Sequence, residues 1–523
     1  MKICIIKKKT ALISLLISVL SIYAYRFILS DIGVGYMVSA YLVCTLIWMV
    51  LGEGFSDVMS RMIRSRLSKG QKSNAGTILS VSLVNQFLAA LVGAFFCIFV
   101  TYYSMNDFFE LPKGRFLGFY IAAFFFFRMI NEYLYGYASV SSGDRAICIT
   151  YVLRELLRIA AGFAFMKFMY DKGVIAGYIL MDDDMKYIYA AAGLFIGFCI
   201  AEAFVFFFLF IVRLGLKMKS VGEHDAFSGK DRVGYIFFTL WRRRLGSMLH
   251  GVFFCLLLYS CIMISGDATN IGIAVSMLVI PFAISVIVSL FCGTSAAINW
   301  VGSVRKNEKG PSRAFFDFGI HIVVISAVFF TAFFASVSKL LTKVLVAEGG
   351  PSLTTELILI LIASVAFVMY WFCDHLCAMR DDRIPRIIAD AAAGFAGLLT
   401  VRLSSGAHSV FRTLMLAILV YSIIGMAIWC VITYLRMSMV FDPLRNVLLP
   451  IVSGAVSAIF LLLITNAAAP HLGNLFTICL CIPIGLIIYH SVLLLLRNYT
   501  EYELKLIPFG GLLYSLGQIL KVM

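Results

Sequence analysis

The chain has 523 residues, of which 62% are hydrophobic and only 14% are charged. Soluble domains are about 45–50% apolar and about 25% charged, so this composition excludes an ordinary soluble globular enzyme. The formal net charge of +15 would suggest nucleic acid in a soluble protein, but we find no nucleic-acid-binding motif and expect no such partner.

Long apolar runs predict membrane-spanning helices. Residues 190–212 and 476–496 are almost uninterrupted by polar side chains, whereas a transmembrane barrel would alternate apolar and polar residues. About 20 apolar residues cross the hydrocarbon core, so we predict an all-α membrane protein with about fourteen transmembrane helices. In chain order these are 10–30, 36–62, 74–103, 116–140, 147–170, 187–212, 241–264, 270–297, 315–341, 356–379, 384–403, 411–435, 447–466 and 475–496.

The distribution of Lys and Arg predicts the orientation of these helices. The basic runs 7–9, 61–72, 242–244 and 305–313 all fall on one side of the arrangement, and the opposite loops carry few basic residues. Because Lys and Arg concentrate in cytoplasmic loops, we expect a multi-pass protein of the cytoplasmic (inner) membrane with both termini cytoplasmic.

A faint internal repeat predicts the domain organisation. Residues 32–35 and 271–274 have similar sequences, and a Lys-Gly pair follows each at nearly the same distance. We therefore expect two six-helix lobes in a parallel pseudo-repeat plus two C-terminal helices, a plan known among transporters. Thr500 and Glu503 form a capping-box pattern in the tail. The expected parts are an N-lobe (1–214), a cytoplasmic linker (215–234), a C-lobe (235–440), helices 13 and 14 (441–498) and an interfacial C-terminal helix (499–523).

Charged residues inside the predicted spans are the first candidates for function, because a charge at mid-helix costs about 2.5–3.5 kcal/mol on insertion scales. Arg128 and Glu132 share a helix face, and Arg154, Glu155 and Arg158 follow in the next helix. The two helices run back to back from a turn, so these residues are expected at matching depths. They form either an ion-paired structural cluster or a cationic wall that faces an anionic substrate.

Three further charges in the first half have two interpretations each. Arg26, near the outer end of the first helix, either reaches the surface or binds phosphate through its guanidinium. Glu53 lies between two glycines, and it either meets basic residues at the inner interface or serves in coupling. Glu202 either pairs with the arginines of helix 5 or carries a coupling proton. The second half offers His321, Asp374 and His375, where packing is the simpler interpretation.

The candidate set therefore has two parts. The substrate-binding candidates are Arg26, Arg128, Arg154 and Arg158, and the coupling or ion-pair candidates are Glu53, Glu132, Glu155 and Glu202. We find no nucleotide-binding loop, nucleophile elbow or zinc signature, so we expect no catalytic residues, cofactor or metal.

Four stretches carry a likeness to a known family. They are Gly52-Glu53-Gly54-Phe55-Ser56, Ile280-Pro281-Phe282-Ala283-Ile284, Asp381-Asp382-Arg383-Ile384-Pro385 and Leu506-Ile507-Pro508-Phe509-Gly510. With these motifs in this order, the chain resembles the multidrug/oligosaccharidyl-lipid/polysaccharide exporter superfamily, and within it the stage V sporulation protein B and lipid II flippase branches.

The resemblance implies two lobes around a central cavity, a lipid-tail groove formed by helices 13 and 14, and flipping of a lipid-linked sugar pyrophosphate by alternating access. It also implies cavity-lining arginines in the first lobe, where Arg26 occupies a comparable position. The chain departs from the lipid II branch in having a single deep arginine in helix 1 and very few in the second lobe.

Our main hypothesis is a flippase or exporter, not an enzyme, that moves a lipid-linked anionic oligosaccharide, either lipid II or a surface polysaccharide unit. Its expected partners are this substrate, membrane lipids and cell-wall or polysaccharide synthases. A cation-coupled multidrug antiporter of the same fold is the alternative, and it would depend on unpaired acids such as Glu53 or Glu202. A membrane-embedded glycosyltransferase or polymerase would need a large outer loop, but the longest one predicted, 171–186, is short.

Overall fold

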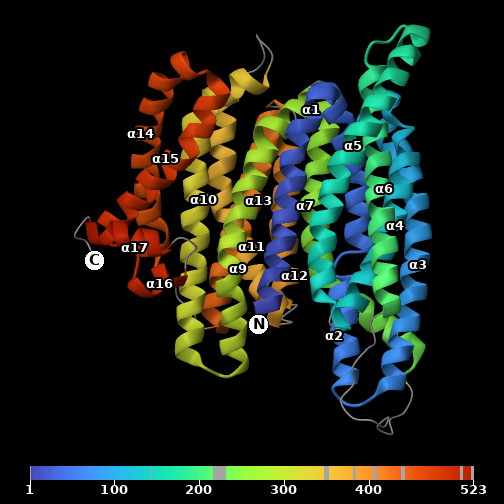
Figure 1. Cartoon of the computed structure of the whole chain (residues 1–523), viewed down its shortest axis with the longest axis horizontal. Helices are drawn as coiled ribbons and strands as arrows, with labels where there is room; N and C mark the ends of the chain where they lie inside the picture. The colour runs from blue at the N-terminus through green and yellow to red at the C-terminus, as the bar shows by residue number, and fades with distance from the viewer. Residues whose placement is uncertain are drawn as a thin grey trace. The chain divides into compact units, whose positions relative to one another are not determined.

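The computed structural model describes residues 2–141, 143–215, 231–346, 353–380, 384–404, 409–437, 442–506 and 510–519. Every regular element in these residues is a helix (Figure 1), which confirms the all-α class. Linker residues 216–230 and motif residues 381–383 and 507–509 lie outside the described part of the chain.

Contacts divide the chain into a first unit, residues 2–272, and a second unit that begins at Ile273. The main helices of the first unit are α1 (Lys2–Leu51), α2 (Phe55–Leu67), α3 (Lys72–Tyr103), α4 (Leu117–Val140), α5 (Asp144–Leu180), α6 (Met185–Gly215) and α7 (Val233–Ser265). The short helix α8 (Ala268–Ala274) carries the chain across the division. The domain boundaries predicted from the sequence stay predictions.

Twelve helices within the described residues are long and apolar enough to cross a membrane. The prediction of fourteen is not confirmed, and two features account for the difference. The first two predicted spans form one candidate, Ile5–Leu67, because α1 continues through a single non-helical residue, Ser30 (φ 52°, ψ −174°). The other feature is α5, which is absent from the twelve and carries Arg154, Glu155 and Arg158 in its first half.

The predicted helix 36–62 is wrong in one respect, because the structure breaks it in two. The helix α1 ends at Leu51, and α2 begins at Phe55 after the segment Gly52-Glu53-Gly54. Gly54 has a φ of 69°, in the left-handed region that glycine adopts at little cost. The break therefore leaves backbone groups at the ends of α1 and α2 without hydrogen-bond partners in their own helices.

The hairpin of α5 and α6 positions half of the candidate charges, and its two helices approach closely (Figure 1). A Cβ atom on Gly197 of α6 would lie 2.5 Å from the backbone nitrogen of Gly162 of α5. Such a distance is closer than side-chain packing permits. Glycine at this position therefore sets the spacing between the two helices.

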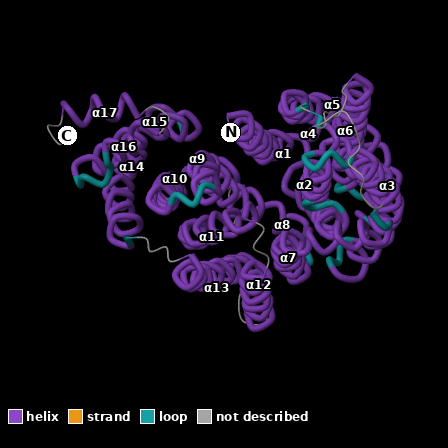
Figure 2. The backbone as a smooth tube through the Cα atoms, turned by 90° about the horizontal axis from the view of Figure 1, so that it is seen from below, coloured by secondary structure: helices purple, strands orange, loops and turns teal. Residues whose placement is uncertain are grey.

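In the second unit, α10 (Lys309–Leu345) packs against four neighbours, three of which, α9, α11 and α14, are labelled around it in Figure 2. The other helices are α9 (Ile280–Arg305), α11 (Thr354–Arg380), α12 (Ile384–Ser404), α13 (Val410–Met437), α14 (Leu449–Leu472), α15 (Asn474–Leu495), α16 (Glu501–Leu506) and α17 (Gly510–Ile519). Short π-helical or 3-10 turns lie at Ser104–Phe108, Pro112–Gly114, Val275–Val279 and Leu444–Leu448.

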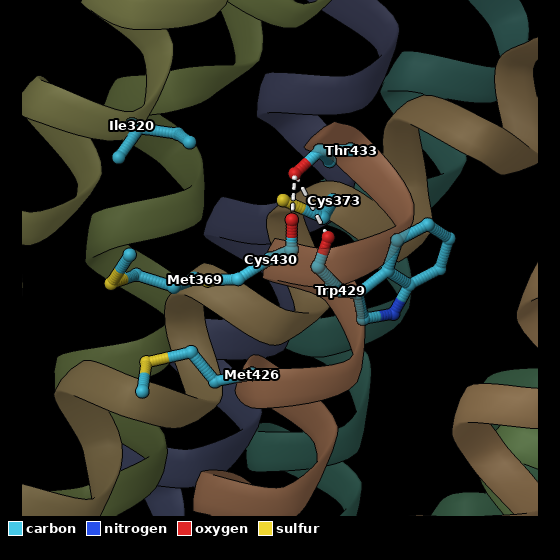
Figure 3. Close-up of a pocket in the computed structure, with 7 residues that line it drawn as sticks. All are labelled: Ile320, Met369, Cys373, Met426, Trp429, Cys430 and Thr433. Carbon is cyan, nitrogen blue, oxygen red and sulfur yellow. Dashed lines mark hydrogen bonds between the residues drawn. The ribbon is translucent and has the colours of Figure 1, made fainter. Parts of the chain in front are cut away.

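The helices α10, α11 and α13 also border a small apolar pocket (Figure 3). Its lining residues are Ile320, Met369, Cys373, Met426, Trp429, Cys430 and Thr433. The Thr433 hydroxyl donates to the backbone oxygen of Trp429 at 2.9 Å. The hydroxyl group in this pocket is thus satisfied within its own helix, α13.

Within the second unit, the C-terminal tail is joined to α10 and to the segment before α14 through Glu503. Its carboxylate accepts a hydrogen bond from the Thr500 backbone N–H at 2.8 Å, which confirms the predicted capping box, and it pairs with Arg445 and with His321 at 3.2 Å. Arg445 also reaches Asp317 of α10 at 3.4 Å. Burial alone would raise the pKa of Glu503, but His321, the Thr500 N–H and Arg445 outweigh it and hold the pKa below its ordinary value of 4.5.

We expect Gly197→Ala to destabilise the protein by about 1–3 kcal/mol, because the added methyl group would force the α5–α6 hairpin apart. Thermal unfolding of the purified protein in detergent measures the change. Gly76→Ala in α3 is the matched control, since a Cβ there meets nothing within 4 Å. Equal melting temperatures for the two variants would contradict the close packing.

Glu503 should make the free energy of unfolding decrease as the pH falls into the acidic range. Because its pKa is lowered by folding, its contribution is complete above pH 4.5 and is lost as the pH falls below that value. Glu503→Gln should cost about 1.5–3 kcal/mol at neutral pH, as expected for hydrogen bonds to charged groups. Melting temperatures measured from pH 7 downward should then fall more steeply for the wild type than for the variant.

Candidate functional site

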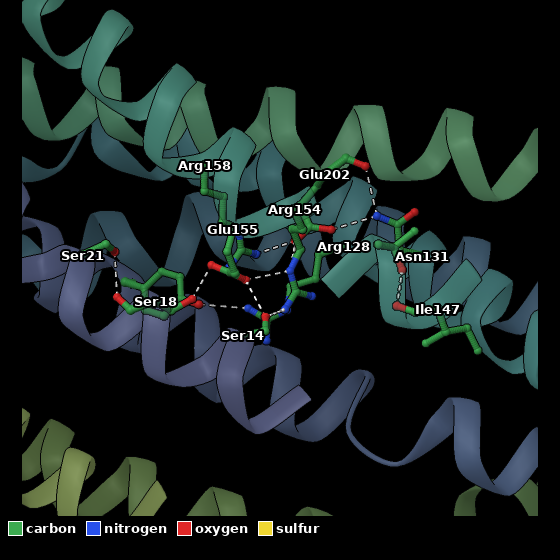
Figure 4. A network of polar contacts seen from close by, with 12 residues as sticks. Ser14, Ser18, Ser21, Arg128, Asn131, Ile147, Arg154, Glu155, Arg158 and Glu202 are labelled. Carbon is green, nitrogen blue, oxygen red and sulfur yellow. Dashed lines mark hydrogen bonds and ion pairs between the residues drawn. The ribbon is translucent and has the colours of Figure 1, made fainter. Parts of the chain in front are cut away.

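Two arginines and two glutamates meet between α5 and α6 (Figure 4). The Glu155 carboxylate lies 2.9 Å from Arg154 Nε and 3.3 Å from Arg158 Nη1, and Arg158 Nη2 pairs with Glu202. Glu155 and Glu202 are 2% and 1% exposed. We call these four residues the ion-pair cluster. The sequence also placed Arg128 and Glu132 in this group, and neither is part of it. The interpretation in which Glu202 pairs with an arginine of α5 is confirmed.

Polar side chains from two further helices complete the ion-pair cluster. Ser14 of α1 donates to Glu155 at 3.1 Å, Ser18 donates to the other oxygen of the same carboxylate, and Asn131 of α4 donates to Glu202 at 2.8 Å. Sequence reasoning missed all three. A signal existed for the serines, because Ser14, Ser18 and Ser21 recur at helical spacing on one side of an otherwise apolar helix.

The charges of the ion-pair cluster balance, with two guanidinium groups against two carboxylates. Within the described residues, their hydrogen bonds and ion pairs are with one another and with Ser14, Ser18 and Asn131. Buried ions are tolerated when they are paired and hydrogen-bonded in this way. The geometry therefore favours the structural interpretation, and a substrate contact by Arg154 or Arg158 stays a prediction.

Arg128 of α4 is arranged differently. Its Nη1 donates to the Tyr41 hydroxyl at 3.0 Å, and its Cζ lies 4.2 Å from the centre of the Trp48 ring. Among the described residues, no carboxylate lies within 4.0 Å of this guanidinium. Arg128 is thus a half-buried cation held by aromatic side chains of α1, without an acid in direct contact.

Glu132 does not form the pair with Arg128 that their spacing allowed. It lies near Ser56 at the start of α2, and it is within electrostatic reach of Glu53 and Asp57. The two acids Glu53 and Glu132 therefore lie close to the helix break, and neither has an ion-pair partner within 4.0 Å in the described part of the chain.

Arg26 forms a bidentate ion pair with Asp31, at 2.6 and 2.8 Å. The pair bridges Ser30, the residue at which α1 departs from helical geometry. Two of the guanidinium nitrogens thus bind a carboxylate of the same chain, and the pair braces the junction between the first two predicted spans.

Arg244 of α7 is a residue that sequence reasoning missed, because it belongs to the basic run 242–244. It is only 1% exposed. Its Nε donates to the backbone oxygen of Glu53 at 2.8 Å and its Nη2 to that of Val50 at 3.2 Å, so it caps the end of α1. Its Nη1 has no hydrogen-bond partner among the described residues.

The second unit contains a buried pair as well. Arg386 of α12 binds Asp374 of α11 through two hydrogen bonds of 2.7 and 2.8 Å, and the hydroxyl of Tyr370 donates to Asp390. The sequence indicated Asp374, but Arg386 and Asp390 were missed. Arg386 belongs to a basic stretch at the start of α12, and Asp390 precedes a run of alanines. His321, the other candidate, contacts Glu503 of the tail.

Comparison with solved structures shows that this fold is similar to that of several membrane transporters. The lipid II flippase MurJ in an inward closed conformation matches with a TM-score of 0.62 at 10% identity, over 92% of this chain and 99% of that one. A MOP superfamily transporter from Pyrococcus furiosus matches at 0.58 and 13%, over 83% and 98% of the two chains. A eukaryotic MATE transporter, AtDTX14, matches at 0.57 and 12%, over 83% and 93%.

No family model matches the sequence, and no curated protein matches it. At identities of 10–13%, the likeness concerns the fold alone. The solved neighbours are transporters and a flippase.

Glu202→Ala should lower the free energy of unfolding by about 3–5 kcal/mol, because it leaves Arg158 buried without its partner. Asp171→Ala removes a partner from the exposed pair of Lys167 and Asp171, and it should cost no more than about 0.5 kcal/mol. Thermal unfolding in detergent compares the two variants. A stable Glu202→Ala protein would show that the ion-pair cluster does not hold the hairpin in place.

Proposed function

We propose that this chain is a multi-pass transporter of the cytoplasmic membrane that moves a lipid-linked anionic oligosaccharide by alternating access. The observation that carries the proposal is Arg128, a guanidinium inside a spanning helix with no carboxylate within 4.0 Å among the described residues. An intramembrane cation of this kind is costly unless an anion meets it. Lipid II and a surface polysaccharide unit are both suitable cargoes, because each carries a pyrophosphate.

The geometry around Arg128 suits a phosphate contact. A guanidinium has five N–H donors, and the hydrogen bond to Tyr41 uses one of them. The Trp48 ring supports one face of the group, which fixes its plane. The edges of a guanidinium held in this way bind phosphate oxygens in a bidentate manner.

The comparison with solved structures is consistent with a flippase. The likeness to MurJ extends over 92% of this chain, against 81–83% for the MATE and other MOP structures. The larger share supports the expectation that the C-terminal helices belong to the transport machinery. Cytoplasmic termini, and an association with membrane lipids and with cell-wall or polysaccharide synthases, remain part of this proposal.

A cation-coupled multidrug antiporter is the second candidate. The observation in its favour is that Glu53 and Glu132 lack ion pairs within 4.0 Å in the described residues, since acids of that kind attract cations. Glu202, which the sequence offered for this role, is paired with Arg158. Loss of drug efflux on Glu53→Gln, with lipid-linked sugars distributed normally, would favour the antiporter.

Arg128→Gln should reduce flipping at least about tenfold, because the lost charge-assisted contact is worth about 1.5–3 kcal/mol. The measurement follows a labelled polyprenyl-pyrophosphoryl sugar in proteoliposomes. Lys167→Gln, a change at an exposed lysine, is the control and should flip at the wild-type rate. Unchanged flipping by Arg128→Gln would rule out this residue as the substrate contact.

A further inference from the structure

Four charged side chains surround the interruption between α1 and α2, and all belong to the first unit. Glu53 lies in the interruption itself, Arg128 and Glu132 lie on α4, and Arg244 lies on α7. The charges of Arg128 and Arg244 are within electrostatic reach of Glu53, and Glu132 is within reach of Glu53 and Arg128. We call these four residues the break site.

The acids of the break site differ from those of the ion-pair cluster. Glu155 and Glu202 contact arginine side chains directly, whereas Glu53 and Glu132 contact none within 4.0 Å in the described ranges. Glu132 instead lies near Ser56 at the start of α2. Glu53 and Glu132 are both half-buried. Two carboxylates near one another repel when both are ionised, so such a pair binds a proton more readily than a lone acid.

The cations of the break site retain unused donors. Arg244 is 1% exposed, and its Nη1 has no hydrogen-bond partner in the described part of the chain. A buried donor left unpaired costs about 1–3 kcal/mol, so this nitrogen indicates a missing acceptor. Arg128 likewise has donors beyond the one that binds Tyr41.

Several other titratable groups lie near the break site. Asp57, Tyr135, Tyr151, His250 and Cys255 interact electrostatically with Glu53 or Glu132. Arg128 also interacts electrostatically with Tyr41, Cys44, Arg154 and Glu202. Asp57 is exposed at the start of α2, so water screens it more than the two half-buried acids.

We propose that the break site binds a phosphate-type anion together with one proton, which is shared by Glu53 and Glu132. With both acids ionised, their charges cancel those of Arg128 and Arg244, and the four groups have no net charge. One proton leaves a net charge of +1, so the two guanidinium groups attract the anion. This proposal rests on the proposed function in taking Arg128 as a substrate contact, and it adds Arg244 and the proton.

Coupling of this kind is reciprocal, because a proton that tightens anion binding must itself bind more tightly when the anion is present. The proton comes from water on the side where the substrate enters, and it returns to water when the substrate leaves. A pH difference across the membrane would then drive transport of the anion together with the proton.

The test measures binding to the full-length purified protein in lipid nanodiscs at pH values from about 5.5 to about 8. Three probes keep a constant charge over this range: sulfate, the sugar pyrophosphate diester UDP-N-acetylglucosamine, and a polyprenyl-pyrophosphoryl sugar. Tryptophan fluorescence reports binding, since Trp48 stacks on Arg128. Binding by all three probes indicates a general phosphate site, and binding by the polyprenyl probe alone identifies a lipid-linked ligand. Both results support the site.

In the wild type, the dissociation constant should rise up to about tenfold per pH unit, as one linked proton requires. Glu53→Gln and Glu132→Gln each fix the net charge at +1, so both should bind tightly and independently of pH. Glu308→Gln, at an exposed acid of the second unit, is the matched control and should keep the wild-type pH dependence. Melting temperatures confirm that each variant is folded.

Two results separate this inference from the proposed function. A wild-type dissociation constant that does not change with pH, combined with binding that needs Arg128, overturns the proton coupling and leaves the transporter proposal intact. If no probe binds at any pH and Arg128→Gln flips normally, both proposals are wrong. The inference also fails if Glu53→Gln and Glu132→Gln keep the pH dependence of the wild type.

Discussion

The structure of the first unit depends on one constraint, the cost of a charge away from water. Glu155 and Glu202 are almost fully buried, and they are stable there because Arg154 and Arg158 donate to them directly. The close approach of α5 and α6 at Gly197 brings these helices near enough for the pairing. Serines of α1 and an asparagine of α4 satisfy the remaining carboxylate oxygens, so four helices are joined at one neutral cluster.

The cost of a charge away from water also makes the unpaired charges candidates for a functional role. Near the interruption of α1, two acids and two arginines lie within electrostatic reach without direct ion pairs among the described residues. Glu155 and Glu202 show that this fold can pair a buried acid directly with an arginine, yet the acids near the interruption are not paired in this way. Groups left with unused hydrogen-bonding capacity are suited to a ligand or a proton, and this difference separates a structural cluster from a candidate site.

The sequence predicted the spans well because an apolar run of about 20 residues has few alternatives to a membrane helix. It predicted the break less well. Gly52 and Gly54 were visible as a motif, yet a glycine pair inside an apolar run is compatible with a continuous helix, and only the φ of 69° at Gly54 decides otherwise. Similarly, spacing allowed Arg128 to pair with Glu132, but Arg128 donates to Tyr41 and Glu132 lies near Ser56.

The sequence by itself determined the class, an all-helical membrane protein with its unusual charges in the first half, because composition and hydropathy act residue by residue. Tertiary structure alone decided which of those charges neutralise one another. Partners such as Glu202 for Arg158, or the Glu53 and Val50 carbonyl groups for Arg244, are far apart along the chain. Their pairing depends on how helices rotate and cross, and a single sequence carries no direct record of that geometry.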